Sequence, residues 1–394
     1  MTMTCCDGRA NDDDDEVDST RGRAGPRDGG RAGPRDGGRL RESTTVDAAT
    51  YGSRGRRLGK GAYGEVFEYT RSDVSSDGTG TGRASASMTV DGRGTEGGGA
   101  ASFAVKELDK RRLASVFVGS DRKRTLLDQA RAESELQSLC ACENVVEAYV
   151  WVNDASSTQV RLVMEHCERG SIVDDEAETF EPFDSEKIKI ILRSILRALR
   201  TCHKRDVVHY DIKPQNVFET SDGTYKLGDF GCACEVERDK KTGERELVSK
   251  TPGTPAFTAP ECCEGEPADG FKADVWAAGM TAHALATGKY FYRADGAWET
   301  YQKILTHRVD FTEIDKRGDD GFSDLMRRLL EPDPAKRLSA SRALLHPWFP
   351  QEPARVMSST PRPALRWYQR PFRWLRMKFA KRKKGKDGAA AERK

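Results

Sequence analysis

The spacing of apolar residues changes near the middle of the chain. In the first half, four segments alternate apolar and polar residues like half-buried β-strands, namely 56–69, 102–108, 145–152 and 160–166. In the second half, apolar residues recur at helical spacing from Ile188 to Cys202, which predicts a long amphipathic helix. Further helices are expected over 274–287, 301–306, 322–330 and 339–345. A strand-rich part followed by a helix-rich part predicts an α+β fold of two packed lobes, with a ligand site between them.

Composition excludes two classes of protein. No stretch approaches the roughly 20 consecutive apolar residues that a membrane span needs, and the acidic run Asp12–Glu16 stands where a secretory signal would need apolar residues. The 10 cysteines include no Cys-x-x-Cys pair for zinc or redox chemistry. We therefore expect a reduced protein of the cytoplasm.

The charge of the chain is divided unevenly. Residues 351–394 carry fourteen Lys and Arg against three acidic residues, a net +11, so residues 1–350 carry −9 of the formal total of +2. A body with this balance has no bulk charge suited to nucleic acid, and no nucleic-acid partner is expected.

The C-terminal tail interleaves aromatic and basic residues between Arg366 and Lys384. Phe372, Leu375 and Phe379 share one face of a helix, as in helices that bind calmodulin or an anionic membrane surface. A solvated or domain-docked tail is the plain alternative. The basic run 381–384 would equally serve nuclear import, which adds the nucleus to the expected location.

Two low-complexity segments set the expected domain boundaries. The octad RAGPRDGG occurs twice in tandem within residues 1–50, which are too polar to bury a core and are predicted to be a disordered leader. Residues 71–102 are rich in Gly, Ser and Thr and are predicted to be a flexible insertion in a hairpin. The expected organisation is a leader to 50, a folded domain over 51–349 and a basic aromatic tail over 350–394.

Five short segments carry the chemistry, in one order along the chain. They are GKGAYGEV at 59–66, FAVK at 103–106, HYDIKPQN at 209–216, DFG at 229–231 and APE at 259–261. Glycines of the first segment let main-chain N–H groups approach phosphate oxygens without a Cβ in the way. An ordinary Gly-rich hairpin would have the same pattern, so it is the ordered set that is specific.

Together these segments resemble the eukaryotic protein kinases, over about Tyr51–Phe349. The resemblance implies a bilobal kinase fold, in which a small lobe of antiparallel strands plus one helix and a larger, mainly helical lobe hold ATP between them. It also implies an active serine/threonine kinase that uses ATP and Mg²⁺, because the family's catalytic groups are all present. A nucleotide-binding scaffold without turnover is the alternative.

The resemblance gives the polar residues of the second half their roles. Asp211 would accept the proton of the incoming protein hydroxyl, and Lys213 would balance charge at the γ-phosphate. Asp229 would hold the magnesium ion that bridges phosphate oxygens, and Asn216 a second one.

In the first half, Lys106 would pair with the α- and β-phosphates. Its partner is expected to be Glu133 on the following helix, with Glu135 as the second choice. The link between the lobes is expected at 164–167, where main-chain groups would bind the adenine edge. The nucleotide contacts implied by the resemblance are Leu58, Gly59, Lys60, Gly61, Ala62, Tyr63, Gly64, Glu65, Val66, Ala104, Lys106, Met164, Glu165 and Cys167.

Tyr210 departs from the pattern of most kinases that are regulated by an activation-loop phosphate. Those kinases carry arginine at this position, and a phenol cannot make the bidentate, charge-assisted contact of a guanidinium group. We therefore expect catalysis to depend little on phosphorylation of Thr251, the hydroxyl nearest the usual site.

Residues 250–263, KTPGTPAFTAPECC, are similar to the activation segment of the calcium/calmodulin-dependent protein kinase kinases. They resemble still more that of the plant kinases that switch on the SNF-related, AMP-activated class. The resemblance implies that the protein partner is another kinase, labelled on its activation-loop threonine, and that Thr254 steadies Asp211 and Lys213. Trp151 and Tyr210 also resemble the Wee-type cell-cycle kinases, so a serine/threonine kinase of another group is the alternative. A pair of Glu261 with Arg337 is expected as architecture.

Overall fold

The structure is a computed structural model, and it describes residues 40–43, 51–61, 64–71, 101–118, 124–174, 176–248 and 253–350. It consists of two compact units, Met1–Leu344 and Leu345–Lys394. The fold and the site lie in the first unit; in the second, the rings of Trp348 and Phe349 pack 5.1 Å apart. The tandem octads, most of the 71–102 insertion, Ala62, Tyr63, Thr251 and the basic tail lie outside the described residues.

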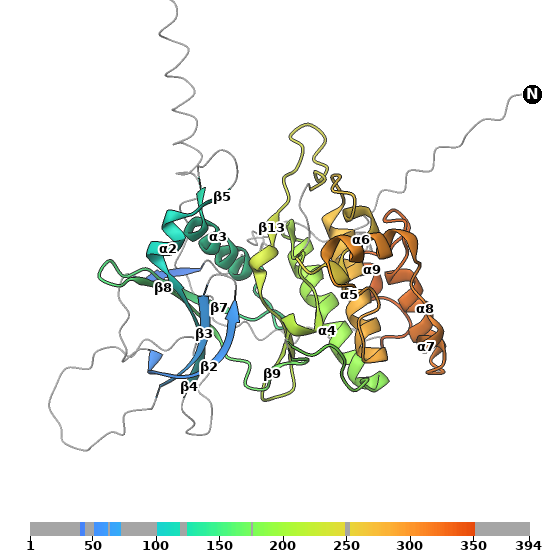
Figure 1. The fold of residues 1–394 in the computed structure, drawn as a ribbon, viewed down its shortest axis with the longest axis horizontal. Helices are drawn as coiled ribbons and strands as arrows, with labels where there is room; N and C mark the ends of the chain where they lie inside the picture. The colour runs from blue at the N-terminus through green and yellow to red at the C-terminus, as the bar shows by residue number, and fades with distance from the viewer. Residues whose placement is uncertain are drawn as a thin grey trace, which may run out of the picture. The chain divides into compact units, whose positions relative to one another are not determined.

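A six-stranded sheet forms the small lobe, in the order β1-β7-β8-β4-β3-β2 (Figure 1). The strands are β1 (Arg41–Ser43), β2 (Ser53–Gly61), β3 (Gly64–Arg71), β4 (Ala101–Asp109), β7 (Ala148–Val152) and β8 (Gln159–Glu165). Neighbours are antiparallel, except that β1 runs parallel to β7. The strands predicted at 102–108, 145–152 and 160–166 are confirmed with shifted ends. The segment 56–69 is instead a hairpin, because its Gly-rich turn divides it into β2 and β3.

Strand β1 differs from the expected domain boundary, because it lies inside the segment assigned to the leader. Leu40, just before it, is 8% exposed and packs in a core cluster with Leu108, Trp151 and Leu162. Glu42 forms an ion pair with Arg131 of the neighbouring helix. A strand of three residues next to Gly-rich sequence is too short to show alternation, so apolar spacing could not have revealed it.

Helix α3 (Leu126–Leu139) is the main helix of the small lobe; the shorter α2 (Lys110–Ser115) and a two-strand pair, β5 (Phe117–Val118) and β6 (Arg124–Thr125), precede it. A capping box begins α3, because Thr125 accepts from the Asp128 N–H while the Asp128 side chain accepts from the Thr125 N–H. The helix packs against β7 and against η2 (Phe230–Cys232). It therefore connects the small lobe to the DFG segment.

Within the described residues six helices form the large lobe, and Figure 1 shows them gathered in the green-to-orange half of the ribbon. They are α4 (Ser185–His203), α5 (Gly270–Thr287), α6 (Ala297–Thr306), α7 (Thr312–Asp315), α8 (Asp320–Leu329) and α9 (Ala340–Ala343). The predicted stripe from Ile188 to Cys202 is buried in α4, which packs against α5 and α9. All five predicted helices are present with shifted ends, and the bilobal kinase fold is confirmed.

Short strands and single turns carry or flank the motifs of the second half. They are β9 (Gly170–Ser171), β10 (Val207–Val208), η1 (Pro214–Asn216), β11 (Val217–Glu219), β12 (Tyr225–Leu227), β13 (Cys234–Glu235), η3 (Pro255–Phe257) and η4 (Pro260–Cys262). Within the part of the chain that the structure describes, no helix is both long and apolar enough to pass through a bilayer.

Candidate active site

Asp274 of α5 fixes the loop between β10 and η1. This buried carboxylate accepts the main-chain N–H of His209 at 2.9 Å and that of Tyr210 at 2.8 Å. Its Oδ2 also lies 2.9 Å from Nε2 of His203. Three contacts on one buried side chain hold the backbone of the motif 209–216 in place before any ligand binds.

His209 connects this loop to the DFG segment. Its Nδ1 accepts the N–H of Asp211 at 3.3 Å, so its proton belongs on Nε2, which donates to the Gly228 carbonyl at 3.1 Å. The Phe230 ring packs edge-on against the imidazole, with centroids 4.7 Å apart. These contacts join the two segments directly.

Asp211 is the centre of a set of polar contacts that come from its own loop and from the activation segment. Its Oδ1 accepts a hydrogen bond from Thr254 Oγ1 at 2.7 Å. Its Oδ2 lies 3.1 Å from Lys213 Nζ and accepts from Asn216 Nδ2 at 2.9 Å. Lys213 Nζ also donates to Thr254 Oγ1 at 2.9 Å. Four residues that the sequence predicts to act together are thus in direct contact.

The charge state of Asp211 follows from these contacts. Burial of the carboxyl group opposes ionisation, but the Lys213 ammonium and the Thr254 hydroxyl outweigh burial and hold the pKa of Asp211 below its usual range. Asp211 is therefore a carboxylate at neutral pH, and the donors Lys213 and Thr254 orient it.

Asn216 and Asp229 present oxygen atoms suited to a divalent cation. The amide nitrogen of Asn216 donates to the Asp211 carbonyl at 2.7 Å as well as to Oδ2, which leaves the amide oxygen as its remaining polar atom. Asp229 is exposed and has a left-handed backbone, with φ 55°. One carboxylate, one amide oxygen and phosphate oxygens make the ligand set that Mg²⁺ prefers, so these residues fit such an ion.

Tyr210 and Asp229 both carry a side chain at positive φ, and among the described residues only Asp206 does so besides them. Such backbone costs on the order of 1–3 kcal/mol and persists where the surroundings impose it, as at active sites. Tyr210 directly precedes Asp211, and Asp229 begins the DFG segment, so both strained positions lie within the catalytic motifs.

Lys106 and Glu133, the pair expected at the phosphate site, come from two different elements of the small lobe. Lys106 is on β4, and its Cε lies 3.9 Å from the place where a Cβ on Gly61 would be. Glu133 is buried on α3 and accepts a hydrogen bond from Gln129 at 2.9 Å. The contact between Lys106 and Glu133 stays a prediction. Glu135 is exposed and pairs with Arg131, which favours Glu133 as the inward-facing choice.

Glycine has two different structural roles in the hairpin between β2 and β3. A Cβ on Gly64 would lie 2.0 Å from the Glu107 carbonyl, so Gly64 permits the close approach of β3 to β4. A Cβ on Gly59 would meet nothing within 4 Å, so its surface is open. Leu58 and Val66, on the two strands, are half-buried, while Lys60 and Glu65 are paired in register.

The link between the lobes follows β8. Ala104 lies opposite Met164 in the β4–β8 register. The two residues are thus placed to bound the expected adenine pocket together. The Glu165 side chain pairs with Lys226 of β12 at 3.0 Å, an ion pair that crosses between lobes. The Cys167 carbonyl accepts from the Gly170 N–H, whereas the Cys167 N–H makes no main-chain hydrogen bond within the described residues. Burial raises the pKa of the Cys167 thiol to about 12, so it stays neutral.

A cavity of about 410 Å³ opens beside Lys213 and Thr254. Its wall continues along the activation segment at Pro255–Phe257 and along residues 290–297 and Thr300. Gln215, on its floor, donates to Tyr290 Oη at 2.5 Å. A polypeptide in this cavity would lie next to Asp211.

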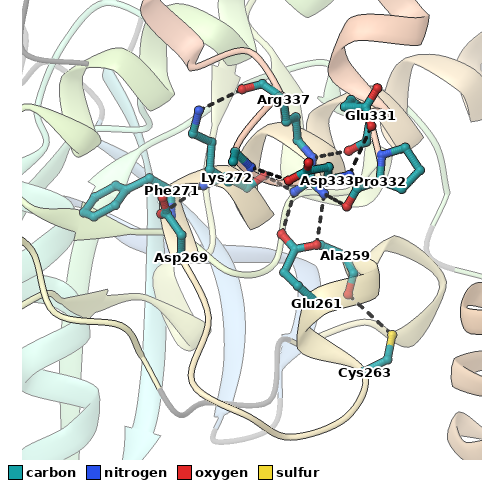
Figure 2. Close-up of polar contacts among 11 residues, drawn as sticks. Ala259, Glu261, Cys263, Asp269, Phe271, Lys272, Glu331, Pro332, Asp333 and Arg337 are labelled. Atoms are coloured by element: carbon teal, nitrogen blue, oxygen red, sulfur yellow. Dashed lines mark hydrogen bonds and ion pairs between the residues drawn. The ribbon is translucent and has the colours of Figure 1, made fainter. Parts of the chain in front are cut away.

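The activation segment is fixed at its far end by Glu261 and Arg337. The guanidinium group makes a bidentate contact, with Nη1–Oε1 at 2.6 Å and Nη2–Oε2 at 2.9 Å, and its side chain is fully buried (Figure 2). Arg337 also donates to the carbonyls of Glu331, Lys272 and Pro332. The expected architectural pair is confirmed, and it holds the segment that supplies Thr254.

Fold and site together have the arrangement of a protein kinase. The protein kinase domain family matches residues 86–349, well over half of the sequence, and the chain therefore belongs to that family. A domain of this kind uses ATP and a divalent metal ion.

The curated relatives are serine/threonine kinases. The chain is 29% identical to serine/threonine-protein kinase GRIK2 of Arabidopsis thaliana, over 76% of this chain and 65% of that protein. It is 31% identical to serine/threonine-protein kinase TOS3 of Saccharomyces cerevisiae, over 55% and 43%, and 30% identical to CBL-interacting serine/threonine-protein kinase 15 of Arabidopsis thaliana, over 63% and 55%. The chain thus spans between 43% and 65% of the length of these relatives. These relatives are what the chain is similar to, and each is by its name a serine/threonine kinase.

Sequence reasoning did not find two parts of the site. A Cβ on Gly253 would lie 2.5 Å from Asp211 Oδ1, so only glycine allows the activation segment to approach this closely. The cavity wall at Tyr290–Ala297 comes from a loop without a motif. The Gly-Thr-Pro triplet at 253–255 could have indicated the close approach at Gly253. No residue pattern indicated the cavity wall.

Proposed function

We propose that this chain transfers the γ-phosphate of ATP to serine or threonine hydroxyls of a protein substrate, with Mg²⁺ as the metal ion. The observation that carries the proposal is the contact set at Asp211, which combines an ionised carboxylate, a lysine and an activation-segment threonine within 3.1 Å. A purely structural ion pair needs neither the cavity beside it nor the strained backbone around it.

The residues divide the work of phosphoryl transfer. Asp211 accepts the proton of the substrate hydroxyl through a carboxylate oxygen, and the Thr254 hydrogen bond fixes its direction. Lys213, held by Thr254, places its positive charge where the γ-phosphate leaves. A bound metal ion neutralises phosphate oxygens, and Asn216 and Asp229 are the residues that would hold it.

In the first half of the chain, Lys106 binds the α- and β-phosphates next to Gly61, whose Cβ position lies 3.9 Å from Lys106 Cε, and near the open surface of Gly59. The Cys167 N–H, which has no main-chain partner among the described residues, donates to the adenine edge. Leu58, Val66 and Ala104 close the apolar walls around the base.

We further propose that the substrate is the activation-loop threonine of an SNF-related or AMP-activated type kinase. The support is the activation segment 250–263, together with the similarity to GRIK2. The alternative is a serine/threonine kinase that acts on other proteins.

The test offers the full chain a panel of catalytically inactive kinases with radiolabelled ATP and Mg²⁺, and maps the labelled residue. Label on one activation-loop threonine is the expected result. Asp211→Asn is expected to abolish labelling, whereas Asp315→Asn, at an exposed pair with Arg327, serves as the matched control. Label on a generic protein but on no kinase would contradict the narrower proposal. ATP binding without any labelled protein would contradict both.

A further inference from the structure

Asp206 binds two arginines of residues 236–248, the connecting segment that leads from the DFG motif toward the activation segment. Arg238 makes a bidentate contact with its carboxylate, with Nε–Oδ2 and Nη2–Oδ1 both at 2.8 Å. Arg245 donates from Nε to the same Oδ1 at 2.8 Å. Burial of the carboxyl group opposes ionisation, but the hydrogen bonds from both arginines outweigh burial and hold the pKa of Asp206 below its usual range. Isolated exposed ion pairs contribute little, whereas bidentate arginine contacts and networks of charges do contribute.

The main chain of Asp206 holds the same segment. Its carbonyl accepts the N–H of Val236 at 2.7 Å, directly after β13. Its backbone is left-handed, with φ 57°, which aspartate tolerates better than most residues do. Asp206 also directly precedes β10, which leads into the loop that carries Asp211. One residue of the large lobe thus fixes the start of the connecting segment by both its side chain and its main chain.

Arg245 extends these contacts to Asp274, the carboxylate that fixes the loop between β10 and η1. Its Nη2 donates to the His203 carbonyl at 2.6 Å, and its Cζ lies 4.2 Å from the centroid of the Phe271 ring, which Figure 2 labels. The Phe271 ring packs edge-on against His203, with centroids 5.0 Å apart, and His203 Nε2 lies 2.9 Å from Asp274 Oδ2. A continuous set of contacts therefore joins the connecting segment to the support of the catalytic residues.

The connecting segment is also fixed along its length. Arg238 and Arg245 form an antiparallel bridge, and Arg238 Nη1 donates to the Gly243 carbonyl at 3.0 Å, so the segment folds back on itself. At its far end Val248 pairs with Ala268, just before α5.

The chain then reaches the residue that orients the base. The next described residues are Gly253, whose N–H donates to the Tyr210 carbonyl at 3.0 Å, and Thr254, which donates to Asp211 at 2.7 Å. Where an added phosphate orders an activation segment, the phosphate is the anion that binds arginine side chains. Here a carboxylate of the large lobe is the anion, and the arginines belong to the connecting segment. Tyr210 offers no positive charge to a phosphate.

We propose that Asp206 is a positioning residue for phosphoryl transfer, whose carboxylate takes the place of an activation-loop phosphate. It holds Arg238 and Arg245, and with them the connecting segment, in the conformation that keeps Thr254 in contact with Asp211. This inference rests on the proposed function, because it names what holds the base of that reaction in place.

The first experiment removes the charge of Asp206 and keeps its shape. In the full chain, Asp206→Asn is expected to lower kcat at least fivefold and to change KM for ATP less than twofold, with the substrate labelled most strongly in the panel above. The loss falls on kcat because Thr254 and Asp211 act on the acceptor hydroxyl. Asp315→Asn is the matched control, since Asp315 pairs with an arginine that also lies over an aromatic ring, and it should change kcat less than twofold.

A double-mutant comparison tests whether Asp206 acts through the arginines. In a chain that carries Arg238→Met and Arg245→Met, Asp206→Asn should lower kcat less than twofold, because the carboxylate has no guanidinium group left to hold.

Amide hydrogen exchange adds a readout that is independent of catalysis. Asp206→Asn should speed exchange at Val236 and Gly253 at least tenfold and leave the amides of α8 unchanged, whereas Asp315→Asn should not affect Val236 or Gly253. Treatment of the unmodified chain with a protein phosphatase should leave its initial kcat within twofold.

The outcomes separate this inference from the proposed function. If the unmodified chain labels no substrate, the proposed function fails and the positioning role fails with it. If the unmodified chain is active, four results refute the positioning role alone. They are an unchanged kcat in Asp206→Asn, an equal loss in the chain without the two arginines, exchange that rises equally throughout the domain, and a loss of tenfold or more after phosphatase treatment.

Discussion

Thr254 donates its hydroxyl proton to Asp211 at 2.7 Å, and the same oxygen accepts a hydrogen bond from Lys213 at 2.9 Å. A side chain of the activation segment therefore sets the geometry of two residues of the catalytic loop, 41 and 43 positions away in sequence. The conformation of the activation segment and the orientation of the Asp211 carboxylate are therefore coupled.

Replacing Thr254 by alanine should lower kcat by about 10- to 100-fold, or about 1.4–2.7 kcal/mol of transition-state stabilisation. Asp211 would lose the hydroxyl that donates to it, and Lys213 would lose the oxygen that accepts from it. Thr254→Ser keeps the hydroxyl and should retain most of the activity, measured with a peptide substrate at saturating ATP. Equal losses in the two variants would show that the methyl group, and not the hydroxyl, is what matters.

The pH dependence of kcat/KM should depend on Lys213. The Lys213 ammonium is the strongest of the influences that lower the pKa of Asp211 against burial. A base with a lowered pKa stays ionised as the pH falls, so the acid limb of the unmodified enzyme lies at low pH. Lys213→Met should raise the pKa of Asp211 and move that limb to higher pH. Lys316→Met, at an exposed pair with Glu313, should leave it in place; an unmoved limb in the Lys213 variant would remove Asp211 as the titrating base.

Arg337→Ala should lower the free energy of unfolding by about 3–5 kcal/mol, because it leaves Glu261 without its partner in a buried pair. Arg337→Lys should recover only part of this loss, since an ammonium group cannot make the bidentate contact. Urea denaturation measures both variants. Arg328→Ala breaks an exposed pair with Asp324 and should cost less than about 1 kcal/mol; similar losses at the two arginines would contradict the structural role of Arg337.

Tyr210→Phe should leave stability unchanged within about 0.5 kcal/mol or raise it slightly. The phenol is 4% exposed, and among the described residues its oxygen has no hydrogen-bond partner. Burial, with Cys262 and Cys234 nearby, raises the pKa of Tyr210, so no charge is lost either. The matched control is Tyr292→Phe, which deletes a buried hydroxyl that donates to His307 at 2.6 Å and should cost about 1 kcal/mol or more.

Thr251→Ala should reduce kcat/KM by much less than 100-fold. The reason is that the buried, neutral Tyr210 stands where an arginine would bind an activation-loop phosphate. Thr251 itself lies outside the described residues. Kinetics with the same peptide substrate check this prediction, and a loss of 100-fold or more, about 2.7 kcal/mol, would show that the phosphate is required after all.

The sequence predicted the fold and the site wherever a residue pattern has a single physical cause. The apolar stripe of α4 and the alternation of apolar residues in β4 and β8 follow from burial on one side. All three elements lie where the spacing predicted them. The pairing of Glu261 with Arg337 and the meeting of Asp211, Lys213, Asn216 and Thr254 followed from motifs with fixed chemical roles.

The rest depends on contacts between distant segments that leave no local signal. Strand β1 is defined by its pairing with β7 and by the burial of Leu40, and neither can be seen in three residues. Gly253 is needed because Asp211 lies 2.5 Å from where its Cβ would be. The cavity wall at Tyr290–Ala297 arises only when helices and loops come together.

The position of β1 bears on how the protein is produced for experiments. It occupies the edge of the sheet, so a chain trimmed to begin at Tyr51 would leave the N–H and C=O groups of β7 open along that side. Uncovered strand edges pair with other chains and promote aggregation. Preparations that retain residues 40–43 should therefore stay dispersed at concentrations where shorter ones self-associate.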